Sequence, residues 1–191
     1  MDHAIWVFVH VMLLVYWLGA DLGVFLLAKA AKRPELSFAE RAFALQMAIR
    51  IDLVPRLCFT VMFPVGLHVT ASGGFAVVPT SAFVLAWAVS FAWIALLVTL
   101  GRHEGKPLAA RLNHWHLGLQ ALLLVIVGAI GISSWLGDGP LPGGWFAATI
   151  VLFALIFAMG IGIAVDGAIR YVLGLYALLI AIAFLGVTKF L

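Results

Sequence analysis

The sequence predicts an all-α protein, a polytopic transmembrane helical bundle of about six spans that forms one integral membrane domain over residues 1–191. Hydrophobic residues make up 65% of the chain and charged residues only 10%, which is more apolar surface than one soluble core buries. The apolar residues also fall into runs of roughly 20, the length that crosses a bilayer as a helix. The net charge of +3 is spread between these runs rather than along one face, so nucleic acid is not an expected partner.

The apolar runs give the approximate bounds of the spans. They cover residues 4–28, 50–71, 81–101, 113–136, 144–165 and 167–190. The stretches "KRPE", "SGGF", "EGKP" and "GDGPLPGG" supply turn residues between them. Almost nothing separates the last two spans, so four or five spans with a re-entrant segment form an alternative.

The segment from residue 35 to residue 50, "ELSFAERAFALQMAIR", places apolar residues at helical spacing between charges. An amphipathic helix on the cytoplasmic surface would show this pattern. A plain extension of the second span would show it equally well.

Basic residues crowd the first, third and fifth connections, and Lys189 is the exception. Because Lys and Arg concentrate in cytoplasmic loops, both termini are predicted to lie outside. The expected location is the inner membrane of a bacterium.

Two charged residues lie inside the predicted spans at one depth. Asp21 and Arg56 both fall on the cytoplasmic side of the midplane, and a charge in that region costs at least ~2.5 kcal/mol without a partner. A structural ion pair between Asp21 and Arg56 is therefore predicted. The alternative is that Arg56 bonds Asp52, one turn earlier.

Two histidines share a level on the outer side of the midplane, His10 on the first span and His68 on the second. Imidazoles from facing helices in apolar surroundings are the axial ligands that a b-type haem uses. The hypothesis is one haem b with His10 and His68 as iron ligands, Trp17 in the pocket wall and Arg56 near a propionate. The alternative is that both histidines form hydrogen bonds across the bundle or to interfacial water.

The element His10, Trp17, Leu18, Gly19, together with "PVGLHV" at residues 64–69, resembles the first helices of two bacterial membrane families. These are the copper-resistance D family and the membrane protoporphyrinogen oxidase family, small haem-binding or metal-associated proteins. The resemblance covers the first two or three helices. It implies a haem or metal site on the first helix, but a catalytic lysine of the oxidase family has no match here.

The remaining histidines give a weaker second candidate for iron ligation. His103 ends the third span, and His114 and His116 begin the fourth. A second haem would need His103 and His116, whereas interfacial anchoring beside Trp115 is the simpler role for His114 and His116. The fifth and sixth spans contain no histidine, which favours one haem over two.

Three functions remain open from the sequence. The first is a haem redox protein, an oxidoreductase or electron carrier acting with a lipophilic partner such as quinone or porphyrin. The second is a metal or small-solute transporter. The third is a non-catalytic subunit of a membrane complex, in which buried polar residues only hold helices together; a homo-oligomer is also compatible. Glycine-rich stretches at residues 128–134 and 160–167 predict close helix packing, and Asp166 is expected to pair with Arg170.

Overall fold

The computed structural model describes residues 2–103, 105–166 and 169–189, and over these residues the chain is all-helical with no strand. All six helices are long and apolar enough to cross a membrane, which indicates a multi-pass membrane protein. They are α1 (Asp2–Ala31), α2 (Phe38–Ser72), α3 (Thr80–Arg102), α4 (Pro107–Leu136), α5 (Trp145–Asp166) and α6 (Ile169–Thr188). The predicted fold class is confirmed. The placement of both termini outside stays a prediction.

The helix bounds follow the predicted spans with two main differences. α2 begins at Phe38 rather than at residue 50, and α4 begins at Pro107 rather than at residue 113. Proline suits the first turn of a helix, where its missing N–H has no partner to lose. The predicted ends of the sixth span, residues 167 and 190, lie outside the described residues, but α5 and α6 are each long enough for a full span.

The long α2 decides between the two alternatives for the segment that precedes the second span. A capping box starts the helix: the Ser37 side chain accepts a hydrogen bond from the Glu40 N–H, and the Glu40 carboxylate accepts one from the Ser37 N–H. The helix then runs 35 residues without interruption, about 52 Å against a hydrocarbon core of about 30 Å. The segment is therefore an extension of the second span and not a separate surface helix.

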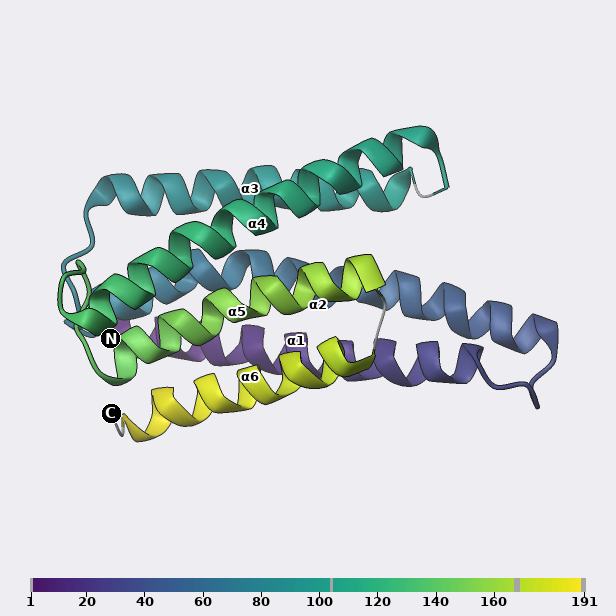
Figure 1. The fold of residues 1–191 in the computed structure, drawn as a ribbon, viewed down its shortest axis with the longest axis horizontal. Coiled ribbons are helices and arrows are strands. Elements are labelled where there is room, and N and C mark those ends of the chain that lie inside the picture. The colour runs from purple at the N-terminus through teal and green to yellow at the C-terminus, as the bar shows by residue number, and fades with distance from the viewer. Residues whose placement is uncertain (1, 104, 167–168, 190–191) are drawn as a thin grey trace. The chain divides into compact units, whose positions relative to one another are not determined.

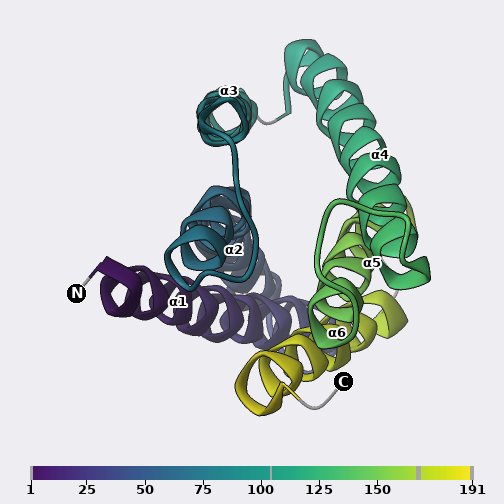
Figure 2. The ribbon, with the colours of Figure 1, turned by 90° about the vertical axis from the view of Figure 1, so that its left-hand side faces the viewer.

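Contacts between helices divide the chain into two compact units, Met1–Ala109 and Ala110–Leu191. In the first unit α1 and α2 run side by side, joined at one end by residues 32–37 (Figures 1 and 2). At the opposite end His3 Nδ1 lies 3.1 Å from Ser72 Oγ. α3 packs on α2, where Ser90 Oγ donates a buried hydrogen bond of 2.7 Å to the Thr60 carbonyl.

Small residues bring helices of the second unit together, at Gly131 within a stretch from which close packing was predicted and at Gly174 outside both stretches. A Cβ atom at Gly131 of α4 would stand 2.8 Å from Val151 Cγ2 of α5 and 3.0 Å from the Val151 nitrogen. A Cβ atom at Gly174 of α6 would stand 2.9 Å from Met159 Sδ of α5. Backbones approach this closely only where side chains are absent.

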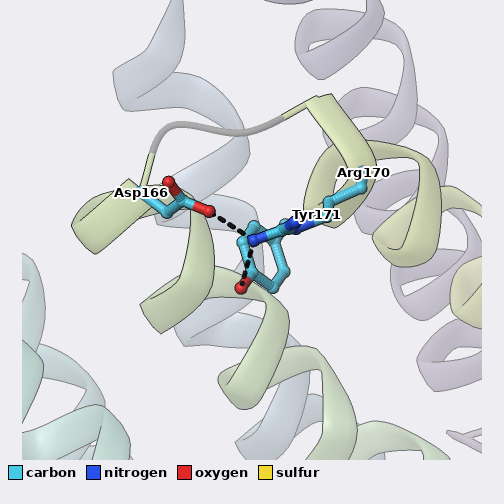
Figure 3. A network of polar contacts seen from close by, with 3 residues as sticks. All are labelled: Asp166, Arg170 and Tyr171. Carbon is cyan, nitrogen blue, oxygen red and sulfur yellow. Dashed lines mark hydrogen bonds and ion pairs between the residues drawn. The ribbon is translucent and has the colours of Figure 1, made fainter.

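The predicted pair between α5 and α6 is also present. Arg170 Nη2 donates to Asp166 Oδ2 over 2.6 Å, and the guanidinium lies between that carboxylate and the Tyr171 hydroxyl (Figure 3). The Arg170 side chain is 71% exposed and the Asp166 side chain 47% exposed. The pair thus lies at the surface of the unit.

Candidate functional site

In the first unit, the imidazole of His68 on α2 has aromatic contacts and one hydrogen bond from neighbouring helices. The Trp6 ring of α1 stacks on the imidazole at 3.9 Å between centroids and an angle of 6°. The Phe83 ring of α3 also stacks on it, at 4.5 Å and 28°. Trp87, one turn further along α3, donates from Nε1 to His68 Nε2 over 3.1 Å. His68 therefore connects three helices through its ring faces and its Nε2 atom.

The hydrogen bond from Trp87 determines whether His68 Nε2 has a free lone pair. A tryptophan N–H is a donor only, so His68 Nε2 accepts with its lone pair. The same lone pair would be needed to ligate iron. His68 Nε2 is thus engaged by Trp87 and cannot serve at the same time as an axial ligand.

His10 differs from His68 in that a buried nitrogen of its ring has no partner. The ring is half-buried on α1, and its Nδ1 atom is fully buried with no hydrogen bond among the described residues. The ring packs on α2 at Gly66, where a Cβ atom would lie 3.6 Å from His10 Cε1. An imidazole nitrogen in this condition costs about 1–3 kcal/mol relative to a satisfied one.

These two environments can be compared with what the predicted haem site requires of its ligands. A haem bracketed by His10 and His68 needs a nitrogen from each ring turned toward one iron, with flat apolar space between. His10 fits the role of an iron ligand because part of its ring is left unsatisfied. His68 as arranged does not fit the second role, since Trp87 engages its Nε2 and aromatic rings stack on it.

Trp17, expected in the pocket wall, lies in the core of the first unit. It is 4% exposed and its ring centroid is 5.1 Å from that of Phe59 on α2. Phe59 in turn contacts Trp93 of α3 edge-on at 5.7 Å. The three rings form an apolar layer across α1, α2 and α3, and a contact of Trp17 with haem stays a prediction.

Arg56 forms the ion pair that the sequence left as the alternative. Its Nη2 atom pairs with Asp52 Oδ2, one turn earlier on α2, and the Arg56 side chain is 42% exposed. Asp21 is half-buried on α1. The pairing of Asp21 with Arg56, and a role for Arg56 beside a propionate, stay predictions.

The histidines of the second candidate site differ from one another in burial. His103 Nδ1 donates to the Thr99 carbonyl over 2.9 Å, and the exposed His114 Nδ1 donates to the Ala110 carbonyl over 2.7 Å. Trp115 is 70% exposed, as expected of an interfacial anchor, but His116 is only 6% exposed. His116 therefore does not act as an interfacial anchor. Successive side chains on a helix point about 100° apart, so His116 points inward where its neighbour Trp115 points outward. Iron ligation by His103 and His116, in different units, stays a prediction.

Gln120 is a polar residue of the second unit that sequence reasoning overlooked. It is 6% exposed, and its Nε2 lies 2.8 Å from His116 Nε2. The available signal was a lone amide four residues after a histidine in the apolar run "HLGLQALLL".

A multi-residue metal centre is not present in the described part of the chain. Over residues 2–103, 105–166 and 169–189, no three His, Cys, Asp or Glu side chains lie close enough together to hold a metal ion.

Comparison with known proteins adds no relative. No family model, no curated protein and no solved structure matches the chain. The resemblance to the copper-resistance D and membrane protoporphyrinogen oxidase families stays an expectation from a few residues of the first two helices.

Proposed function

We propose that the protein is an integral membrane b-type haem protein of the bacterial inner membrane, in which His10 holds the iron. The observation that carries this proposal is the buried His10 Nδ1 without a hydrogen bond. A buried polar group of this kind calls for a partner that the polypeptide does not supply. A haem iron bound by this nitrogen would give the imidazole that partner, with His10 as the protein ligand.

The surroundings of His10 suit such a group. Trp6 lies one turn before His10 on α1 and stacks on His68, and Trp17 lies two turns after His10 and contacts Phe59 of α2. An apolar shell lowers solvent access and tunes the redox potential of a metal group. When bound, a haem supplies one-electron transfer, and the lipid-embedded position favours a lipophilic partner such as a quinone or a porphyrin.

In this proposal His10 is the iron ligand, and His68 Nε2 keeps its hydrogen bond from Trp87 Nε1. One histidine ligand gives a five-coordinate, high-spin iron, whereas two give a six-coordinate, low-spin iron. The spin state therefore distinguishes the structure-based site from the sequence-based pairing of His10 with His68.

The test is the absorption spectrum of detergent-purified protein from haem-replete cells, with electron paramagnetic resonance to assign the spin state. We expect a Soret band with a high-spin signal, lost in His10→Ala and retained in His68→Ala. His114→Ala is the matched control, because His114 is exposed and bonded to its own helix. A low-spin signal lost in both variants would restore His68 as a ligand.

Absence of a Soret band would overturn the haem proposal. His10 would then be a polar residue of a transporter, or of a non-catalytic subunit that locks helices together. Retention of an unchanged band in His10→Ala would overturn the assignment of the ligand while leaving haem binding in place.

A further inference from the structure

The end of the first unit at which α1 turns into α2, residues 29–50, is rich in positive charge, and we call it the basic end (Figure 1). It contains five basic residues and two acidic ones, a net charge of +3. The basic residues are Lys29, Lys32, Arg33, Arg41 and Arg50. Arg41 is half-buried and the other four are exposed. The basic end therefore presents several cations to its surroundings.

These cations are not neutralised by contacts within the protein. Among the described residues, none of the five basic side chains forms an ion pair or a hydrogen bond. Of the two acidic residues, Glu40 is engaged in the capping box, where its carboxylate accepts from the Ser37 N–H and hydroxyl. A concentration of uncompensated charge of one sign favours a partner of the opposite sign.

Large apolar side chains are exposed between the cations. Phe38 is 81% exposed and Phe43 is 63% exposed, and Leu45 and Ile49 are exposed further along α2. Phe38, Leu45 and Ile49 share one face of the helix, because spacings of seven and eleven residues return a side chain to within about 20° of its starting direction. A partner that covers the basic end therefore needs apolar surface beside its negative charge.

The basic end lies next to the part of α2 that suits the bilayer core. Residues 57–72 contain no Asp, Glu, Lys or Arg and span about 24 Å of a hydrocarbon core that is about 30 Å thick. In a bilayer crossed by α2, Arg50 thus lies near the boundary of the hydrocarbon, and the other cations lie from the headgroups outward.

We infer that the basic end binds anionic phospholipid, with the lipid phosphate against the basic side chains and the acyl chains against the exposed apolar side chains of α2. Lysine and arginine form charge-assisted hydrogen bonds with phosphate, and basic clusters beside membrane helices attract anionic lipids. An acidic protein would match the charge alone. A phospholipid carries the phosphate and the hydrocarbon in one molecule, so it also covers Phe38 and Phe43. The inference does not depend on haem binding.

The experiment compares two lipids with the same acyl chains, phosphatidylglycerol and phosphatidylcholine. The first carries a net negative charge and the second is zwitterionic. Native mass spectrometry of the delipidated full-length protein in detergent measures their affinities. We expect phosphatidylglycerol to bind about fivefold more tightly, the effect of one basic residue near a membrane surface. Equal affinities in the wild-type protein would overturn the inference, without any variant, and would favour an acidic protein as the partner.

A triple variant locates the charge that selects the lipid. It combines Lys29→Gln, Lys32→Gln and Arg33→Gln, three exposed positions whose side chains have no partner among the described residues. We expect the preference for phosphatidylglycerol to disappear while the affinity for phosphatidylcholine stays unchanged. A preference that persists in full would overturn the site.

The matched control removes the same charge at the connection between α3 and α4. It combines Arg102→Gln, Lys106→Gln and Arg111→Gln, which are also exposed positions. This variant should keep the preference for phosphatidylglycerol. Equal losses in the two triple variants would show that only the total charge of the protein matters and would overturn the assignment to the basic end.

Two further measurements test the apolar part of the contact. The double variant of Phe38→Ala and Phe43→Ala should weaken the binding of both lipids and retain the preference between them. Glycerophosphoglycerol, the headgroup without acyl chains, should not displace phosphatidylglycerol from the wild-type protein. Displacement by this soluble headgroup would identify a site for a free phosphate compound and overturn lipid binding. Unchanged affinities in the double variant would contradict a contact with α2.

Discussion

The two compact units hold their helices together by different means. In the first unit, side chains reach from helix to helix: Trp87 donates to His68, and Ser90 donates to the Thr60 carbonyl. In the second unit, Gly131 and Gly174 have no side chains and so allow neighbouring helices to approach closely. Lipid tails are as apolar as leucine, so helices in a bilayer associate through close packing and interhelical hydrogen bonds. The contacts named here for the first unit are hydrogen bonds, and those named for the second unit are close glycine contacts.

The difference bears on function. In the first unit, polar side chains join the helices. His10 Nδ1 is buried there without a hydrogen bond among the described residues, which makes it a candidate ligand atom. In the second unit, glycines let the helices approach, and the buried Gln120 contacts His116 of its own helix. Both proposed sites, the haem ligand and the basic end, thus lie in the first unit.

Gly131→Leu should give the largest effect on the second unit. The new side chain would meet both the Val151 side chain and its backbone, so α4 and α5 could not keep their distance. We expect a loss of about 3 kcal/mol in the free energy of unfolding, measured by chemical denaturation in detergent. Gly118→Leu is the control on the same helix, because nothing lies within 4 Å of its Cβ position. Equal stabilities of the two variants would remove glycine packing as the basis of this unit.

Trp87→Phe should give an intermediate effect on the first unit. The change keeps an aromatic ring and removes the donor to His68 Nε2, which should cost about 1 kcal/mol of unfolding free energy. His68→Phe retains a ring between Trp6 and Phe83 and removes the acceptor. If the hydrogen bond matters, the effect of Trp87→Phe shrinks in the His68→Phe background, and strictly additive losses would argue against it.

The smallest effect is expected for the ion pair of α2. Asp52→Asn should cost about 0.3–0.5 kcal/mol, since the pair is one turn apart and partly exposed. Two double-mutant cycles compare it with the sequence-based pairing, one combining Arg56→Gln with Asp52→Asn and the other with Asp21→Asn. Coupling only in the cycle with Asp21 would show that the predicted pair between the first two spans is the one that forms.

Individual residues illustrate how far the candidate sites could be predicted. His10 and His68 stood out from the sequence because imidazoles are rare inside apolar spans, and their depth could be counted from the helix ends. The residues that contact His68 could not be predicted by counting along the sequence. Trp6, Phe83 and Trp87 belong to two other helices, and only packing brings them to His68. Gln120 was overlooked because one amide in an apolar run has no pattern until its burial is known.

The sequence by itself determined the class of the protein, whereas the structure decided for six helices over the alternative of four or five spans with a re-entrant segment. Runs of apolar residues long enough to cross a bilayer, separated by glycine and proline, leave the backbone little alternative to helix, because every N–H and C=O group in lipid must be bonded within its own segment. The tertiary structure decided which polar atoms are satisfied. Burial and hydrogen bonding depend on the rotation of each helix and on its neighbours, so only the packed chain engages His68 Nε2 with Trp87 while leaving His10 Nδ1 and Gln120 Oε1 without hydrogen bonds among the described residues.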